Sequence, residues 1–351
     1  MHNKQSVFLN FEKSRSEEFT HNIQLNNLIK ELKFFLEPLQ EKVNEKYSGT
    51  KWPIGIVIGA PRSGTTLLTQ WLASLDLFSY PSNLITRFAY APYIGSLIQK
   101  MLLDSDYDFH GDFQDIQSEV NFKSNLGMSK GALAINSFSH FFRKYLNHYD
   151  PRYIYSEELD SIDTEGINNG IASIEDAFGK PFISKGMMLQ YNIEFFHKKI
   201  PNLFFFYIKR DPLMNMQSLL IARKKYFNDY EKWYSARPKE FEKLERMDKY
   251  HQVAGQIYYT NKSIEKELNE LEEKNRISIK YEEFCKDPSI FFYEMKKKYK
   301  INKYNIDGEY SGIRYFTTSC RKILSNEELD RLSKAYNFFK EIEGDSHSEN
   351  P

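Results

Sequence analysis

A glycine-rich turn between an apolar strand and an amphipathic helix restricts the fold of this chain more than any other feature. Ile54–Ile58 reads as a short apolar strand of the kind that is buried in a parallel sheet. The turn from Gly59 to Gly64 follows, and residues 65–75 then place leucines and a tryptophan on one helical face. Glycines let the backbone turn tightly and direct its N–H groups towards an anion, and the start of the helix adds partial positive charge.

The side chains of this turn indicate which anion it binds. Gly59 and Gly64 have the spacing of a Walker A loop, but the next residue is Thr65, where a nucleoside triphosphatase needs lysine. Arg62 instead places a cation inside the loop, while Thr65 and Thr66 offer hydroxyls and helix N-terminal amides. We therefore expect a phosphate or sulfate group here. The alternative is a tight turn that binds no ligand.

A second anion site is predicted after the apolar strand Leu203–Ile208. Arg210 follows this strand, and Asp211 with Pro212 then begins a helix that carries Ser218. The planar guanidinium group of arginine is suited to bidentate binding of phosphate. In the alternative interpretation, Arg210 pairs with a surface acid such as Asp211, and Ser218 is merely exposed.

The other predicted elements alternate between helices and strands, which favours a parallel sheet with helical crossovers. Helices are expected at residues 20–47, within Ile171–Phe178 and at 248–273, and strands at Pro181–Ser184 and Arg276–Lys280. We expect the abundant aromatic residues mainly to fill the core, with a stacking surface for an acceptor as the alternative.

The segment GAPRSGTTLL at Gly59–Leu68 resembles the 5′-phosphosulfate loop of the sulfotransferase superfamily, which in bacterial members reads close to G-x-P-R-S-G-T-T-L-L. In that family an arginine at a strand end and a serine eight positions later bind a 3′-phosphate, and Arg210 and Ser218 keep this order and spacing. Tyr281–Pro288 is similar to the family's Y-E-D-L-x-x-D-P element, which we interpret as structural. Ser319–Ser325 resembles its C-terminal basic stretch, where Ser319 or Arg321 is a candidate nucleotide contact.

This resemblance implies a sulfotransferase that takes a sulfuryl group from 3′-phosphoadenosine 5′-phosphosulfate (PAPS) and uses no metal. It implies nucleotide contacts from Pro61, Arg62, Ser63, Gly64, Thr65, Thr66, Arg210 and Ser218. The catalytic candidates are Arg62 and Lys185. Lys185 follows the predicted strand, where relatives carry a lysine that contacts the leaving oxygen, although the chain reads Lys-Gly-Met instead of K-x-P.

The base that activates the acceptor is left unassigned. Some relatives use a glutamate shortly after the loop, but residues 80–86 contain no acid, and other relatives use histidine. The predicted insertion offers His110, Glu119, His140 and Glu158.

The predicted fold class is α/β, with a P-loop-like parallel sheet flanked by helices and a helical insertion on the acceptor side. We expect residues 1–351 to form a single sulfotransferase-like domain. Its predicted parts are an N-terminal helix (20–50), the phosphosulfate-loop unit (54–80), the acceptor-side insertion (81–180), the 3′-phosphate-binding half (181–330) and a frayed tail (344–351).

Charge and composition narrow the range of partners. Lys plus Arg number 48 and Asp plus Glu number 48, a balance that argues against general attraction to nucleic acid or acidic membranes. Cys285 and Cys320 form no metal-binding or disulfide pattern, which favours a reducing compartment. Residues 1–20 are polar, and the longest apolar run is too short to span a bilayer, so we expect a cytoplasmic protein.

The acceptor predicted from the sequence is a small molecule or a glycan that presents a hydroxyl or an amine. Two other functions remain open at this stage. The first is a non-catalytic domain that binds PAPS or another anion, and the second is a P-loop nucleotide kinase, which the threonine at position 65 disfavours.

Overall fold

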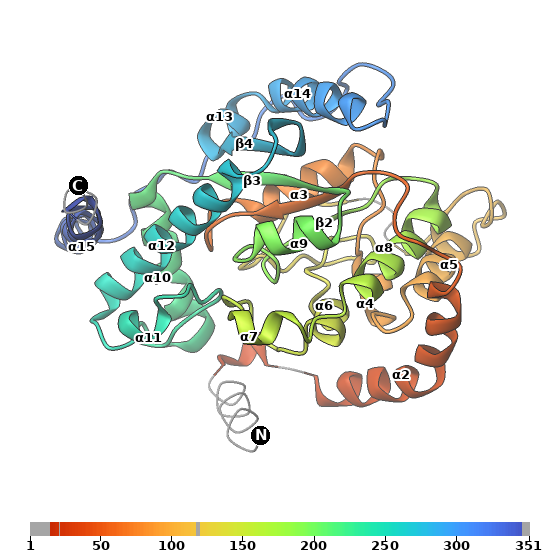
Figure 1. Cartoon of the computed structure of the whole chain (residues 1–351), viewed down its shortest axis with the longest axis horizontal. Helices are drawn as coiled ribbons and strands as arrows, with labels where there is room; N and C mark the ends of the chain where they lie inside the picture. Colours follow the sequence, from red (N-terminus) through yellow and green to blue (C-terminus); the bar gives the residue numbers. More distant parts are fainter. Residues whose placement is uncertain (1–14, 21, 117–119, 346–351) are drawn as a thin grey trace.

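A four-stranded parallel sheet lies at the centre of the protein, in a computed structural model that describes residues 15–20, 22–116 and 120–345 (Figure 1). The strand order is β2-β1-β3-β4. The strands are β1 (Ile54–Ile58), β2 (Ile183–Lys185), β3 (Leu203–Lys209) and β4 (Arg276–Lys280). The predicted α/β class, with helices flanking a parallel sheet, is confirmed.

The register of β1 and β2 corrects one predicted strand. Gly55 pairs with Ile183 and Val57 pairs with Lys185. The paired register therefore begins at Ile183, later than the predicted segment Pro181–Ser184. Phe182 lies at the edge of this ladder: its carbonyl oxygen accepts a hydrogen bond from the Gly55 N–H, and the residue itself bridges Ser79. As a consequence Lys185 is the last residue of the strand and does not follow it.

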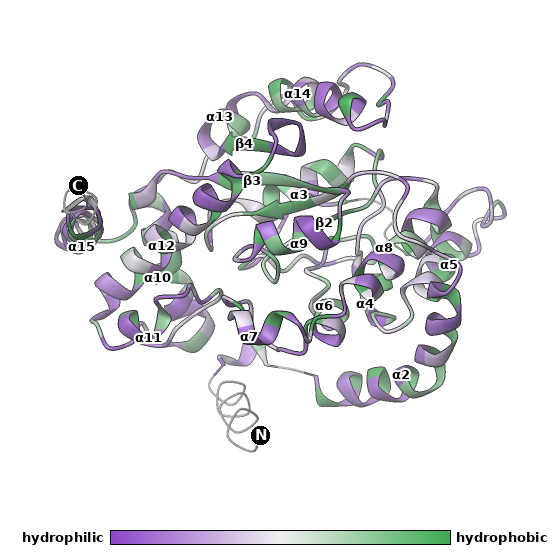
Figure 2. Ribbon diagram, viewed as in Figure 1, coloured by the Kyte–Doolittle hydropathy of each residue, from purple (hydrophilic) through white to green (hydrophobic). Residues whose placement is uncertain are grey.

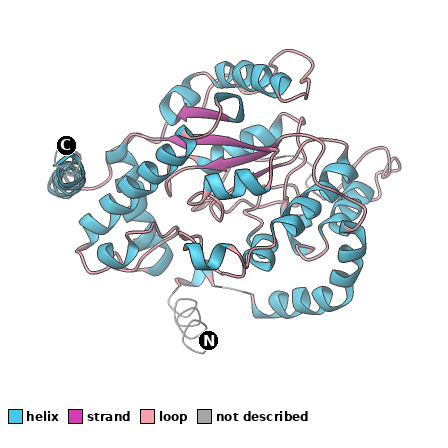
Figure 3. Ribbon diagram, in the orientation of Figure 1, coloured by secondary structure: helices cyan, strands magenta, loops and turns pink. Residues whose placement is uncertain are grey.

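The two faces of the sheet pack against different helices, which Figure 3 shows on both sides of the magenta strands. Isoleucines of β1 face one core, while Val57 and Phe206 belong to the other. The first face is covered by α6 (Ser139–Leu146), α8 (Thr164–Phe178), α9 (Ile193–Lys199) and part of α12 (Lys249–Asn269). The second is covered by α3 (Thr65–Ser74), α13 (Tyr281–Lys286) and α14 (Pro288–Ile301).

Helix α8 begins at Thr164, ahead of the segment predicted from periodicity. Two glycines in its first half allow α6 to approach closely. A Cβ atom on Gly166 would lie 2.3 Å from the ring of Tyr145, and one on Gly170 would lie 2.7 Å from the ring of Phe141. Both glycines therefore serve helix packing.

A third core joins α10 (Pro212–Phe227), α11 (Phe241–Leu244), α12 and α15 (Asn326–Asp345). The predicted polar helix at 248–273 is found as α12, but several of its polar side chains are buried. Gln252 accepts a hydrogen bond from Arg223 at 2.6 Å, and Gln256 accepts a weaker one at 3.4 Å. Burial lowers the pKa of Arg223 to about 10. The glutamines therefore stabilise a cation inside the core.

The predicted insertion contains helices joined by long loops, as expected. Its helices before α6 and α8 are α4 (Asn83–Arg87) and α5 (Pro92–Leu103), and α7 (Ser156–Leu159) lies between those two. The predicted N-terminal helix is α2 (Ile23–Asn44), which contacts α5 and α8. Two residues of its expected packing face, Leu28 and Phe35, are exposed instead.

The remaining elements are the short 3-10 helices η1 (Glu17–Phe19) and η2 (Glu273–Asn275). Helices α14 and α15 are not among the elements expected from the sequence. Because α15 extends to Asp345, the predicted frayed tail at 344–351 begins inside a helix, and its last six residues lie outside the described part of the chain.

Hydrophobic residues gather along β1 and β3, and the outer helices alternate hydrophobic and hydrophilic stretches (Figure 2). Phe204, Phe205 and Phe206 are among the largest fully buried side chains, which supports core filling by aromatic residues. Within the described ranges, no helix is both long enough and apolar enough to span a bilayer.

We expect Phe205→Ala to lower the free energy of unfolding by about 3–5 kcal/mol, because it leaves a cavity in the centre of β3. Phe34→Ala on α2 is the matched control, since the Phe34 side chain is 77% exposed and should cost less than about 0.5 kcal/mol. Chemical denaturation of both variants measures the difference. Equal costs would contradict the assignment of Phe205 to the core.

Candidate active site

The carboxyl ends of the four parallel strands bring four separate chain segments to one edge of the sheet. The turn from Gly59 follows β1, Lys185 ends β2, Arg210 follows β3 and Tyr281 follows β4. In open parallel sheets the ligand site lies at this edge, where neighbouring crossovers run in opposite directions. Here β2 and β3 lie on opposite sides of β1, which places that point at the turn.

The turn has little room for side chains at its two glycines. A Cβ on Gly59 would lie 2.5 Å from the carbonyl oxygen of Ile208, and one on Gly64 would lie 2.5 Å from the ring of Tyr281. Gly64 also has φ +110°, a conformation that favours glycine. Both glycines therefore let the turn press against β3 and the start of α13.

The inner surface of the turn offers hydrogen-bond donors. Gly64 is the N-cap of α3 and supplies no side-chain cap, so the first amides of the helix remain available to a ligand. Ser63 Oγ is buried without a hydrogen-bond partner among the described residues. Arg62 adopts φ +69°, an uncommon conformation for arginine that costs about 1–2 kcal/mol. Such local strain is typical of functional loops.

The two predicted anion sites lie next to each other. Arg62 Nε donates a hydrogen bond to Ser218 Oγ at 3.3 Å, and an Arg210 guanidinium nitrogen donates to the carbonyl oxygen of Arg62 at 3.2 Å. The sites are therefore close enough for one nucleotide to reach both.

Arg210 is buried, with 6% of its surface exposed, and it contacts Ser319 and Tyr281. It donates to the Ser319 backbone oxygen and, at 3.1 Å, to the Ser319 hydroxyl. Its guanidinium group lies 4.8 Å from the centre of the Tyr281 ring, and its Nε has no partner in the described part of the chain. Asp211 accepts a hydrogen bond from the backbone N–H of Met214 and so caps α10. The alternative in which Arg210 pairs with Asp211 finds no support.

Lys185 lies beside the turn. Its Nζ donates to Thr66 Oγ1 at 3.1 Å and lies 3.5 Å from the carbonyl oxygen of Gly127. Burial, helped by the neighbouring positive charge of Arg62, lowers the pKa of Lys185 to about 8. Burial also lowers the pKa of Arg62, and the charge of Arg210 adds to this effect.

Arg62, Lys185 and Arg210 thus form a group of closely spaced cations. None of the three forms an ion pair with a carboxylate in the described ranges. Because burying an unpaired charge is costly, such a group is expected where a ligand supplies the negative charge.

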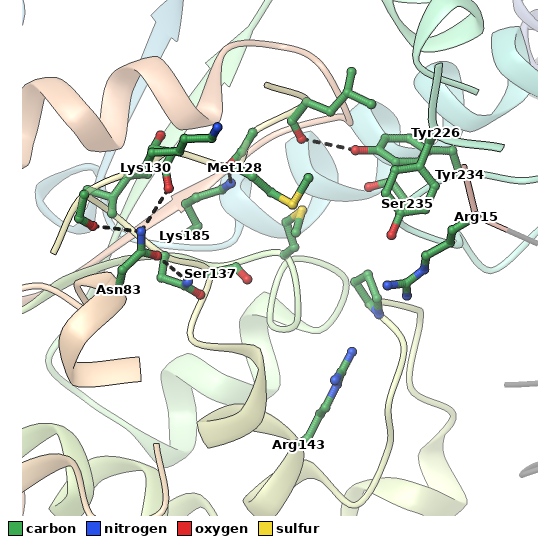
Figure 4. Close-up of a pocket in the computed structure, with 18 of the residues that line it drawn as sticks. Arg15, Asn83, Met128, Lys130, Ser137, Arg143, Lys185, Tyr226, Tyr234 and Ser235 are labelled. Carbon is green, nitrogen blue, oxygen red and sulfur yellow. Dashed lines mark hydrogen bonds between the residues drawn. The ribbon is translucent and has the colours of Figure 1, made fainter. Parts of the chain in front are cut away.

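A cavity of about 910 Å³ opens beside Lys185 (Figure 4). The insertion supplies one wall, through Asn83 of α4 and the loop at 126–132, and the end of α10 supplies another, through Tyr226 and Phe227. Its volume lies in the range of small-molecule sites. The cavity therefore joins the cationic edge of the sheet to a space for a second ligand.

Three of the candidate bases proposed from the sequence, His110, His140 and Glu158, do not line this cavity. The rings of His110 and His140 lie against Phe109 and Tyr90. Glu158 pairs with Arg152 and belongs to the capping of α7. Glu119 lies outside the described residues.

Asn83 and Asp150 are among the polar residues that do line the cavity. Asn83 stands in the segment where relatives carry a glutamate, and its amide donates to Ser129 and Gly131 backbone oxygens. Asp150 contributes the only carboxylate among the described lining residues, and it pairs with Arg237 at 3.3 Å.

Three further residues of the site were not identified as such from the sequence. Tyr281 was interpreted as structural, yet its ring packs on Gly64 and beside Arg210. Asn215 of α10 donates to the carbonyl oxygen of Pro61 at 2.6 Å, and Gly127 approaches Lys185. The Tyr281 motif was a usable signal, whereas Gly127 lies in a loop with no recognised pattern.

Gln217 holds the predicted C-terminal basic stretch against α10. It donates to the backbone oxygen of Arg321 and accepts from the backbone amides of Ile323 and Leu324. Of the two candidate nucleotide contacts in this stretch, Ser319 lies at the site through Arg210. No group of three or more His, Cys, Asp or Glu side chains in the described ranges is arranged to bind a metal, and metal-free chemistry stays a prediction.

Comparison with known proteins gives one family match. A family model described as "Sulfotransferase family" matches residues 53–292, which include the turn, Lys185, Arg210 and Tyr281. No curated protein matches the sequence.

Solved structures similar to this chain are also described as sulfotransferases. Sulfotransferase STF1 from Mycobacterium tuberculosis H37Rv has a TM-score of 0.48 at 12% identity, covering 89% of this chain and 82% of its own. Sulfotransferase STF9 from Mycobacterium avium has a TM-score of 0.42 at 14% identity, with 90% and 73% covered. The sulfotransferase domain from the curacin biosynthetic pathway has a TM-score of 0.38 at 14% identity, with 78% and 82% covered.

We expect Gly64→Ala to lower the free energy of unfolding by about 2–5 kcal/mol, since it adds a collision with Tyr281 to the strain of a positive φ. Gly308→Ala is the matched control, because Gly308 has φ +80° but no heavy atom within 4 Å of a built Cβ. That control should cost only about 1–2 kcal/mol. Chemical denaturation gives both values, and equal values would show that the ring of Tyr281 does not confine the turn.

Proposed function

The chain belongs to the sulfotransferase family, and we propose that it transfers a sulfuryl group from PAPS to a hydroxyl or amine of its acceptor. The observation that carries this proposal is the group of closely spaced cations Arg62, Lys185 and Arg210, of which Lys185 and Arg210 are buried and none has a carboxylate partner in the described ranges. PAPS brings a 3′-phosphate and a 5′-phosphosulfate, so its negative charges match the two neighbouring sites.

The 5′-phosphosulfate would be held by the turn. Pro61, Ser63, Gly64, Thr65 and Thr66 would direct backbone amides and hydroxyls to it, with Arg62 as the cation. The unpartnered Ser63 hydroxyl fits such a ligand.

The 3′-phosphate would be held by Arg210 and Ser218. Arg210 is well placed for this because Ser319 and Tyr281 fix its guanidinium group, and its Nε remains unpartnered among the described residues. Ser218 already accepts a hydrogen bond from Arg62, so both anion sites share one network. Ser319 adds a hydroxyl at the same position.

In the proposed reaction the acceptor oxygen or nitrogen attacks sulfur, and a new bond to sulfur forms as the bond to the bridging phosphate oxygen breaks. The acceptor loses a proton, and adenosine 3′,5′-bisphosphate leaves with the bridging oxygen. Negative charge grows on that oxygen and persists on the sulfuryl oxygens. Lys185 and Arg62 would stabilise this charge, as positioned cations do in related group transfers.

The acceptor is proposed to bind in the cavity beside Lys185. A volume of about 910 Å³ suits a small molecule or the end of a glycan. Tyr226, Phe227 and Tyr234 give part of the wall an aromatic surface, which suits a ring-containing acceptor.

Arg210→Ala should weaken binding of adenosine 3′,5′-bisphosphate by about 10- to 100-fold, because it removes charge-assisted hydrogen bonds to the 3′-phosphate. Binding of adenosine 5′-phosphate should change by less than about threefold. Isothermal titration calorimetry with both nucleotides measures this selectivity. Arg331→Ala on the exposed face of α15 is the control, and equal losses for the two nucleotides would refute the 3′-phosphate role.

Lys185→Ala should reduce turnover by about 10²- to 10³-fold, since it removes a cation from the leaving oxygen. Affinity for adenosine 3′,5′-bisphosphate should stay within about threefold of the wild-type value. Lys180→Ala is the control, because Lys180 forms a surface ion pair with Asp76 and lies away from the turn. Transfer of labelled sulfate from PAPS to pooled acceptors gives the rates, and unchanged turnover would remove Lys185 from the mechanism.

A further inference from the structure

The charge of the cavity differs sharply from that of the whole chain. Lys plus Arg equal Asp plus Glu at 48 each in the sequence. Among the described lining residues, in contrast, Asp150 is the single acid, while the basic residues are Arg15, Arg87, Lys130, Arg143, Lys185 and Arg237. An average surface of this protein would supply similar numbers of both signs, so the described lining of the cavity is selectively basic.

Most of this charge is separate from the proposed donor site. Arg62 and Arg210 do not line the cavity, and Lys185 alone belongs to both places. The other five basic residues therefore face the second ligand and cannot be explained by the phosphates of PAPS.

The basic residues come from separate parts of the chain. Arg87 ends α4, Lys130 lies in the loop of the insertion, Arg143 lies on α6 and Arg237 follows α10. In Figure 4, Arg15 and Arg143 extend towards the open space from different sides, with Lys185 and Lys130 across from Arg15. Convergence of distant segments on one space is typical of a binding site and unlike a solvated helix face.

The single acid among the described lining residues is paired with one of these cations. Asp150 pairs with Arg237 at 3.3 Å, and both side chains are partly exposed. The side chains of Arg87 and Lys130 form no ion pair or hydrogen bond within the described part of the chain, and both residues are exposed to the cavity and solvent. They are therefore available to a ligand.

We propose that the acceptor is an anion, a hydroxylated or aminated compound that carries a carboxylate, phosphate or sulfate group. This inference rests on the proposed function, because it identifies the second ligand of the same reaction. Arg87 and Lys130, with Arg143, would bind the anionic group, and the reacting hydroxyl or amine would point to Lys185. Arginine favours such groups because its planar fork pairs with two oxygens.

Apolar side chains also line the cavity, so we expect the acceptor to carry an apolar portion as well as its anionic group. Leu84, Ile116, Leu126, Met128, Ile135 and Met187 are among the lining residues. An amphipathic acceptor, with an anionic group at one end and a carbon skeleton along these side chains, satisfies both parts.

Calorimetry with simple probes tests the anion preference. The protein is first saturated with adenosine 3′,5′-bisphosphate, which fills the donor site, and then titrated with phenyl phosphate, benzoate or benzyl alcohol. At least one of the two anions should bind about tenfold more tightly than the neutral alcohol. The anion that binds more tightly shows whether the cavity prefers a phosphate or a carboxylate group.

Variants locate this binding. The double variant Arg87→Gln/Lys130→Gln should weaken binding of the preferred anion by at least about fivefold and leave benzyl alcohol unchanged. Lys123→Gln is the matched control, because Lys123 is an exposed lysine of the same loop that does not line the cavity. Equal binding of the three probes, or an unchanged anion affinity in the double variant, would overturn the proposal.

The first step of the same experiment separates this inference from the proposed function. If adenosine 3′,5′-bisphosphate fails to bind, the PAPS proposal is wrong, while anion binding that depends on Arg87 and Lys130 would still support a basic second site. If the nucleotide binds but the anions show no preference, the anionic acceptor is wrong and the donor assignment stands.

Discussion

The parallel order of the four strands is the constraint on which the rest of this structure depends. It brings the ends of β1, β2, β3 and β4 to one edge and so gathers residues that lie more than two hundred positions apart in the sequence, from Gly59 to Tyr281. The turn, Lys185 and Arg210 each lie at the end of a strand. The register of the strands then brings Lys185 into contact with Thr66 and Arg210 into contact with Arg62. An antiparallel partner at any of these positions would carry its residue to the opposite edge.

This arrangement concentrates positive charge at a cost to the folded protein. Arg62, Lys185 and Arg210 repel one another, and Arg62 also holds a strained backbone conformation. Tyr281 and Ser319 offset part of the cost by fixing Arg210, but no carboxylate in the described ranges does so. A polyanionic ligand that binds only the folded state offsets the remainder and raises its stability. The charge cluster is therefore better explained by ligand binding than by stability.

The turn and the strands β1, β3 and β4 could be predicted from the sequence because each depends on a local pattern, whereas Lys185 was assigned through the resemblance to the family. The start of α8 lies ahead of the predicted segment, because Gly166 and Gly170 add no apolar side chain to a helical pattern and only the packing shows that Tyr145 and Phe141 occupy the space they leave. The cavity could not be predicted either. Its six basic residues come from six segments, and only their packing shows that they share one space.

The contact between Gly127 and Lys185 has a thermodynamic consequence. The loop that carries Gly127 also supplies Met128 and Lys130 to the cavity, while Lys185 touches Thr66 at the end of the turn. A ligand that draws the ammonium group of Lys185 towards the turn alters its hydrogen bond to the loop, and so alters the wall of the cavity. Since such linkage is reciprocal, each substrate changes the affinity for the other by the same factor. Coupling between a ligand at the turn and a ligand in the cavity would then pass through one shared ammonium group.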